Sequence, residues 1–292
     1  MNASLELHKG DIGMSLWRSW MFIACTSGAF LLLTACDGPN ASFDKSVPWG
    51  LIGPTVILDS HTHTRFSDGA SDPIDVARAA VLNGCTALAI TDHGDPSLRA
   101  ATPAYFDAID AARVAFPELI VFAGLEWNIQ PYRQREHVTV LLDKVHERTV
   151  LPQFKASFER DDASATDALN WLASKVTSPD EAVLIYNHPS RRDKDEEENL
   201  RDIRAWQTSQ KLFVAFEGGP GHQRSASPGA YDGPIRTNNR WDPAIATIGG
   251  AWDQLLAEGA DFWGAIAVSD YHSDQLDFAP CSFARTSARA SP

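Results

Sequence analysis

Seven short apolar runs, each free of polar alternation, constrain the fold of this chain more than any other feature. They are residues 55–58, 87–90, 119–122, 138–142, 182–186, 212–216 and 264–268. Unbroken runs of this length are typical of β-strands that are buried on both faces. Stretches with helical character separate most of them, namely residues 72–77, 102–115, 164–176, 199–209 and 251–259. Alternating strands and helices predict a parallel α/β sheet, and seven strands favour its closure into a barrel like the TIM barrel.

Residues that can bind metal ions gather at the ends of these runs. The nine candidate ligands are His61, His63, Asp68, His93, Glu126, His137, His188, Asp270 and His272. The carboxyl ends of parallel strands open on one face of a barrel, so we expect these side chains to converge there. Imidazole and carboxylate ligands together favour Zn²⁺, Mn²⁺ or iron over Mg²⁺ or Ca²⁺ alone. The sequence therefore predicts a metal-dependent enzyme. A lone histidine is more often structural, but an ordered series at strand ends points to a site.

The ordered motifs resemble those of the PHP (polymerase and histidinol phosphatase) family. The matching segments, which span residues 59–272, are His61-Thr62-His63, Ser67-Asp68-Gly69, Thr91-Asp92-His93, Glu126, His137, Asn187-His188-Pro189 and Ser269-Asp270-Tyr271-His272. The resemblance implies a distorted seven-stranded (β/α)7 barrel with two or three divalent metal ions. It also implies hydrolysis of a small phosphorylated substrate, as a phosphatase or a phosphodiesterase, by a hydroxide that bridges the metals.

The resemblance also implies which ligands share a metal. The first set is His61, His63, Glu126 and Asp270, and the second is Asp68, His93 and the shared Glu126. The third set is His137, His188 and His272. Some relatives carry His at the position of Asp68, which leaves the metal preference of the second site open.

Other polar residues near these motifs are candidates for supporting roles. We interpret Asp59 and Asp92 as groups that orient the imidazole ligands. Arg65, Arg191 and Arg192 follow ligand motifs closely and are candidates to contact an anionic substrate; the alternative for each is a surface ion pair. His222 follows a glycine-rich run at residues 217–221 and is a candidate general acid, unless that run is only a turn.

The amino terminus has the pattern of an export signal. Lys9 and Arg18 precede a short apolar core that ends in Leu33-Thr34-Ala35-Cys36. These four residues resemble the lipobox of bacterial lipoproteins. We therefore predict a signal peptide at residues 1–35, a tether at 36–53 and the PHP domain at 54–292. The expected product is an exported lipoprotein that is anchored to a membrane by a lipid on Cys36, on the periplasmic or cell-surface side. The alternatives are an uncleaved anchor and an ordinary core helix, and Met14 is a second possible start.

Charge, cysteines and the end of the chain add three expectations. The net charge of −13 argues against an extended nucleic-acid-binding surface. Cys85 and Cys281 would be able to pair in an oxidising compartment, but the position of Cys85 favours a small buried thiol. Related barrels continue further after the position of His272, so residues 54–292 either are truncated or lack a final layer.

Two other functions remain open. Amidohydrolases, which cleave C–N and C–O bonds, also begin with His-x-His on the first strand. Many of them use a carboxylated lysine on a middle strand, and the run 138–142 has no lysine. The other alternative is a metal-binding PHP module without catalytic activity. The fold alone does not decide among these functions.

Overall fold

The computed structural model describes residues 56–191, 196–219, 241–273 and 279–281. They belong to one unit of the chain, residues 56–292. The predicted leader and tether, including Cys36, lie outside the described residues, as do Arg192, His222 and the last eleven residues. Among the helices of the described segments, none is long and apolar enough to cross a membrane.

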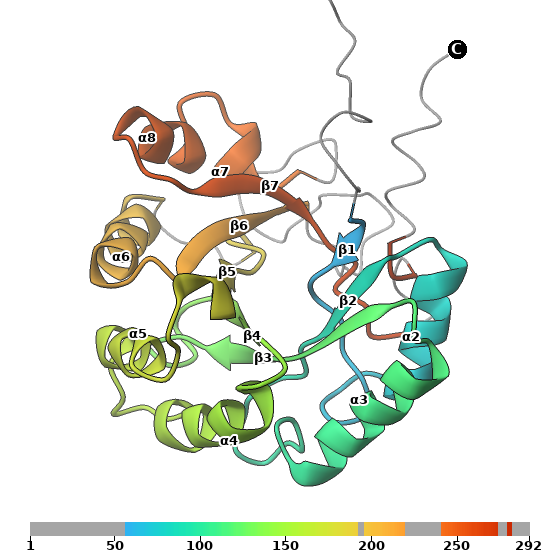
Figure 1. The fold of residues 1–292 in the computed structure, drawn as a ribbon. Coiled ribbons are helices and arrows are strands. Elements are labelled where there is room, and N and C mark those ends of the chain that lie inside the picture. The colour runs from blue at the N-terminus through green and yellow to red at the C-terminus, as the bar shows by residue number, and fades with distance from the viewer. Residues whose placement is uncertain (1–55, 192–195, 220–240, 274–278, 282–292) are drawn as a thin grey trace, which may run out of the picture. The chain divides into compact units, whose positions relative to one another are not determined.

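Seven strands form a single sheet in which the strands follow one another in chain order. They are β1 (Leu58–Asp59), β2 (Ala87–Ile90), β3 (Ile120–Asn128), β4 (His137–Leu142), β5 (Ala182–Tyr186), β6 (Phe213–Gly219) and β7 (Trp263–Ala267). The helices are α2 (Pro73–Leu82), α3 (Pro103–Ala115), α4 (Glu147–Phe158), α5 (Ala165–Ala173), α6 (Glu196–Ser209), α7 (Pro243–Ala246) and α8 (Ala251–Ala257), with a 3₁₀ turn η2 at Pro179–Glu181. The longer helices surround the strands (Figure 1).

The segments that follow β1 and β7 bring the two edges of the sheet together. Thr62 and Tyr271 form a parallel bridge, and the His63 backbone N–H donates to the Tyr271 carbonyl over 2.8 Å. The Ser269 backbone N–H donates to Asp59 Oδ1 over 3.1 Å. The seven strands therefore form a nearly closed barrel, which confirms the predicted fold class.

The direction of β4 corrects the prediction that all strands are parallel. β4 is antiparallel to both of its neighbours, with Asn128 opposite His137 and Leu142 opposite Ala182. Only residues 129–136 connect β3 to β4, whereas a parallel crossover needs about a dozen residues or more. The reversal places the first residue of β4, His137, at the same edge as the last residues of β3. His137 lies at the start of its strand, instead of at the end, because of this reversal.

Helix α3 shows how local sequence builds the outer layer. The Thr102 hydroxyl accepts a hydrogen bond from the Tyr105 backbone N–H at the helix start, and Pro103 occupies the first turn. Tyr105, Phe106 and Ile109 are buried on the inner face. The Tyr105 hydroxyl donates to the carbonyls of Ile90 and Gly124, so α3 is fixed to both β2 and β3.

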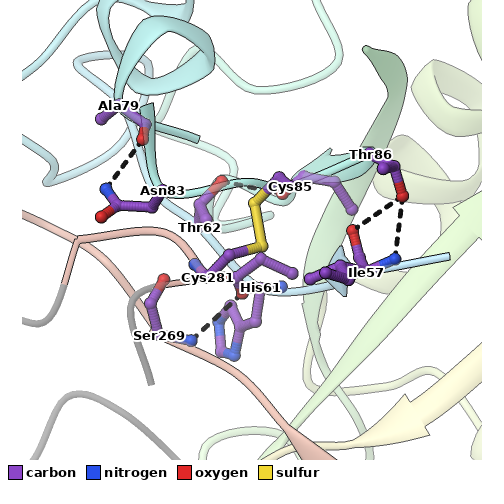
Figure 2. The surroundings of a disulfide bond; sticks show 11 residues. Ile57, His61, Thr62, Ala79, Asn83, Cys85, Thr86, Ser269 and Cys281 are labelled. Carbon is purple, nitrogen blue, oxygen red and sulfur yellow. Dashed lines mark hydrogen bonds between the residues drawn. A yellow bond between two sulfur atoms is a disulfide. The ribbon is translucent and has the colours of Figure 1, made fainter. Parts of the chain in front are cut away.

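A disulfide joins Cys85, just before β2, to Cys281, across a sequence separation of 196 (Figure 2). The structure therefore corrects the expectation of a free buried thiol at Cys85. The bond lies close to the metal-ligand motifs, because the Cys281 backbone N–H donates to Asp59 Oδ2 over 3.1 Å. Asp59 Oδ1 in turn accepts from the backbone of Ser269 and of His61.

Candidate metal centre

The carboxylate of Glu126, near the end of β3, lies at the middle of the predicted site. Glu126 is 1% exposed. Nitrogen atoms of five imidazoles lie 2.7–3.4 Å from its two oxygens; they belong to His61, His63, His93, His137 and His188. These histidines come from β1, β2, β4 and β5 or from the residues just after them. The edge of the barrel therefore gathers groups that are far apart in sequence around one carboxylate.

The four residues of the first predicted set come together. His61 Nε2 and His63 Nε2 lie 3.3 and 3.2 Å from Asp270 Oδ1, and 3.1 and 3.4 Å from the Glu126 oxygens. The two Nε2 atoms are 2.9 Å apart. All four side chains are buried. They form a compact group of two imidazoles and two carboxylates.

The second predicted set also converges, on the exposed side of the first. His93 Nδ1 is 2.7 Å from Glu126 Oε2, and its Nε2 is 3.5 Å from Asp68 Oδ2. The Asp68 side chain is 54% exposed. The loop that carries Asp68 folds tightly against His63. A Cβ on Gly69 would lie only 2.6 Å from the His63 carbonyl group. Glycine at this position therefore permits the close approach.

The three histidines of the third predicted set, His137, His188 and His272, do not all face the same group. His137 Nδ1 and His188 Nε2 face Glu126 Oε1, at 3.0 and 3.3 Å. The His272 ring instead stacks on His63, with centroids 4.1 Å apart, and its Nε2 lies 3.5 Å from Asp68 Oδ1. The reason is local, because His272 Nδ1 donates to the Asp270 carbonyl and this bond directs the ring toward Asp68. His272 thus joins His63, Asp68 and His93.

The arrangement of buried donors and acceptors fits divalent cations. Carboxylates hold the Nδ1 atoms of His61 and His188: Glu217 Oε1 lies at 2.6 Å and Glu136 Oε2 at 2.9 Å. A carboxylate only accepts, so His61 Nδ1 carries the hydrogen that faces Glu217. His188 Nδ1 makes an ion-pair contact with Glu136 but no hydrogen bond in the described residues. Glu126 Oε2 and Asp270 Oδ1 are buried and accept no hydrogen bond from the described residues. Buried carboxylate oxygens that accept no hydrogen bond and face several imidazole nitrogens fit the ligand set of a divalent metal ion.

Electrostatics favour the metal-binding states of Glu126 and His63. Burial opposes the charge of Glu126, but His137, His61 and His93 hold the pKa of its carboxyl well below its usual value. Burial and the neighbouring His272 lower the pKa of His63 to about 3. The carboxylate is therefore ionised and the His63 imidazole neutral near pH 7, which leaves lone pairs available on both. By contrast, and against the effect of burial, Asp270 raises the pKa of the His61 imidazole and Glu126 raises that of His93, which favours their protonated forms when no cation is bound.

Three buried residues support the site in ways that the sequence did not reveal. Glu217 is the carboxylate that holds His61, and Glu136 is the one that holds His188. Asn187 donates from its side-chain amide to Glu126 Oε1 over 2.9 Å and accepts from the Thr139 backbone N–H. Glu217 lies toward the end of β6, as the ligands do on their strands, and Glu136 directly precedes His137. The strand-end position of Glu217 was detectable in the sequence, and that of Glu136 once the direction of β4 was known, but the imidazole that each one contacts was not.

Arg191 reaches the cavity. Eight of the predicted ligands and Arg191 line a cavity of about 160 Å³; the lining residues are His63, Asp68, His93, Glu126, His137, His188, Arg191, Asp270 and His272. The Arg191 guanidinium pairs with Glu136 Oε2 through Nη2 at 2.9 Å and Nε at 3.1 Å. A cationic group thus stands beside the candidate metal ligands.

Arg65 forms the surface ion pair given as its alternative, and Asp59 and Asp92 contact groups other than the expected imidazoles. Arg65 is exposed, pairs with Asp72 and does not line the cavity. Asp92 is buried and accepts from the Thr64 backbone, the Thr64 hydroxyl and the Ser67 hydroxyl, instead of orienting an imidazole directly. Burial raises the pKa of Asp92 to about 6. Asp59 binds backbone amides, as described above. Both aspartates therefore hold the loops that carry the ligands.

Comparison with known proteins gives a family match. Residues 59–156 match the model of the PHP domain. This range includes the first six predicted ligands, up to His137. The resemblance deduced from the motifs is therefore confirmed over this part of the chain. An uncharacterized protein of Methanocaldococcus jannaschii is 29% identical over 179 residues, which are 56% of this chain and 69% of that protein.

Solved structures with similar folds include two bacterial proteins. One is an amidohydrolase from Chromobacterium violaceum with bound sulfate and no metal. Its sequence is 16% identical to this one, and the TM-score is 0.48. The match covers 76% of this chain and 89% of the amidohydrolase chain. The other is a two-domain protein from Bacteroides vulgatus that contains a predicted PHP-like metal-dependent phosphoesterase. It is 18% identical, with coverage of 74% of this chain and 51% of that chain and a TM-score of 0.44.

Proposed function

We propose that this chain, whose residues 59–156 belong to the PHP domain family, is a metal-dependent hydrolase that cleaves phosphate esters. One observation carries the proposal: five imidazoles and the Asp270 carboxylate converge with Glu126 beside a cavity that also receives Arg191. Such a cluster has the ligand types of a site with more than one metal ion, and an anionic substrate suits a cavity with cations and a guanidinium.

The residues divide into ligands for two or three divalent ions, with Zn²⁺, Mn²⁺ or iron as the candidates. His61, His63, Glu126 and Asp270 would hold one ion, and Asp68 and His93 would share Glu126 with a second. His137 and His188, which both face Glu126 Oε1, would contribute to a third. When bound, the ions would lower the pKa of water to provide a hydroxide nucleophile and would neutralise charge on the phosphoryl group.

The chain itself would bind and orient the substrate. The Arg191 guanidinium has the fork geometry that suits phosphoryl oxygens, and its ion pair with Glu136 restricts its orientation. Loops around Asp68 and His272 form the exposed side of the cavity. A small phosphorylated molecule is the substrate that we propose. His222 remains a predicted general acid, and its replacement by alanine would test that role separately.

Hydrolysis of aryl phosphates by the purified protein tests the proposal. We expect turnover of a monoester or a diester with Mn²⁺ or Zn²⁺, its loss with a chelator, and a decrease of at least about 100-fold in His63→Ala. His146→Ala is the matched control, because His146 contacts Asp143 away from the cavity and should retain activity. If the wild-type protein binds its metals but hydrolyses neither ester, the phosphoesterase proposal fails, and amide and lactone substrates become the next test.

We also propose that the protein is an exported lipoprotein anchored through Cys36. This proposal depends only on the amino-terminal sequence. Mass spectrometry of the protein from bacterial membranes should find a lipidated Cys36 as the first residue. In Cys36→Ser the signal should remain attached and the lipid should be absent. A wild-type protein with residues 1–35 still attached would contradict the proposal.

A further inference from the structure

Glu217 contacts two candidate ligands that belong to different parts of the sheet. Its Oε1 lies 2.6 Å from His61 Nδ1, and its Oε2 accepts a hydrogen bond of 2.9 Å from the backbone N–H of His188. Glu217 lies on β6, whereas His61 follows β1 and His188 follows β5. All three residues are buried. One carboxylate therefore fixes the imidazole of one ligand and the backbone of another.

The opposite sides of the two imidazoles also meet at one group. His61 Nε2 lies 3.1 Å and His188 Nε2 lies 3.3 Å from Glu126 Oε1. The two ring centroids are 5.9 Å apart. Cations bound at these Nε2 atoms would consequently share Glu126 on one side and would be linked through Glu217 on the other.

The backbone of His188 gives the second contact of Glu217 a specific effect. His188 has a φ of 32°, in the left-handed region that residues other than glycine rarely adopt. Its N–H bond to Glu217 Oε2 helps to hold this conformation, which directs the ring toward Glu126. Loss of the contact with Glu217 would therefore release a constraint on the His188 backbone.

We propose that Glu217 is a positioning residue that makes metal binding at His61 and at His188 cooperative. The inference rests on the proposed function, since it requires cations at both Nε2 atoms. A cation on His61 Nε2 would strengthen the Nδ1–H donor and order the Glu217 carboxylate. The ordered carboxylate would then hold the His188 backbone, so that a second ion would meet a site that is already arranged. By linkage, an ion at His188 favours binding at His61 by the same factor.

A zinc titration of the metal-free full chain by calorimetry, with a competing chelator, tests this coupling. In the wild-type protein we expect the two sites to fill cooperatively. Glu217→Gln keeps the shape of the side chain but leaves one acceptor oxygen, which can serve His61 or His188 but not both. We expect zinc affinity to fall by about 10- to 100-fold and the sites to fill independently. In Glu217→Gln, ¹⁵N spectra should also show mixed tautomers at His61.

Glu136→Gln is the matched control. It changes the buried carboxylate that holds His188 Nδ1 but leaves the Glu217 link intact, so filling should remain cooperative although His188 binds more weakly. Independent filling in the wild-type protein would overturn the inference, and so would unchanged cooperativity in Glu217→Gln. Even if a variant does not fold, independent filling in the wild-type titration would still overturn the inference. Cooperative zinc binding without ester hydrolysis would reject only the phosphoesterase proposal, whereas no zinc binding at all would reject both.

Discussion

At the scale of single residues, Glu159 makes stability depend on pH. It is 2% exposed and accepts hydrogen bonds from the backbone and side chain of Asn128. Burial nevertheless raises the pKa of its carboxyl to about 7. The folded chain then binds the Glu159 proton more tightly than the unfolded chain does. Its contribution to stability is therefore complete below the ordinary pKa of a glutamate and is lost as pH rises through about 7.

This shift predicts the behaviour of Glu159→Gln. Between pH 5 and 8 the unfolding free energy of the wild-type protein should fall, relative to that of the variant, by up to about 3 kcal/mol. Urea denaturation at several pH values measures the difference. The exposed pair of Glu258 with Arg204 provides a control, since Glu258→Gln should change the pH dependence little. Parallel curves for the wild-type protein and Glu159→Gln would contradict the raised pKa.

The sequence predicted which residues gather but not how each side chain is directed. Eight of the nine predicted ligands line one cavity with Arg191, because the position of a residue at a strand end largely determines where it lies. The partners of His272 could not be predicted, since they depend on a hydrogen bond from its ring to the Asp270 carbonyl. Glu217 and Glu136 were missed for a similar reason. A buried carboxylate next to an imidazole becomes visible only when strand direction and side-chain rotation are known.

At the scale of secondary-structure elements, a buried ion pair attaches α4 to α3 and β3. Arg113 on α3 donates to both carboxylate oxygens of Glu147, at 2.6 and 2.7 Å, and also to the Val121 carbonyl. Glu147 begins α4 and is 1% exposed. We expect Glu147→Ala to destabilise the protein by about 1–3 kcal/mol, because Arg113 and the Ala123 N–H lose an acceptor while Arg113 keeps its pair with Asp110. Thermal unfolding measures the change, and Glu118→Ala, an exposed position, should have almost no effect.

The sequence pattern did not predict helix α4 or the direction of strand β4. Helix α4 was not predicted, because its start is charged and Pro152 interrupts its sequence, although Val150, Leu151, Phe154 and Phe158 are buried along it. The reversal of β4 was also missed. An apolar run has the same appearance in either direction, so only the shortness of the connection at residues 129–136 indicates the antiparallel pairing. Most of the remaining strands and helices lie close to their predicted positions.

At the scale of the whole molecule, the Cys85–Cys281 bond is expected to be a major source of stability. It closes a long segment of chain, with a sequence separation of 196, and such a link restricts the unfolded state strongly. Reduction, or Cys85→Ser, should lower the unfolding free energy by about 2–4 kcal/mol. Urea denaturation with and without a thiol reductant measures this. Cys85→Ser should show no further response to the reductant, and a wild-type protein that is equally stable in its presence would contradict the prediction.

The same bond divides the molecule into a covalent loop, residues 85–281, and a segment that the loop does not enclose. Strand β1, of only two residues, and the His61-Thr62-His63 motif belong to this outer segment. Local unfolding can therefore release β1 while the loop stays closed. Metal ions shared with Glu126 and Asp270 would add to the hydrogen bonds that Asp59 and His63 make with the segment after β7. Zinc should thus slow amide hydrogen exchange at His61 and His63 far more than at Leu184 in β5. The segment around the first strand would then open and close according to whether metal is bound, while the disulfide keeps the rest of the barrel closed.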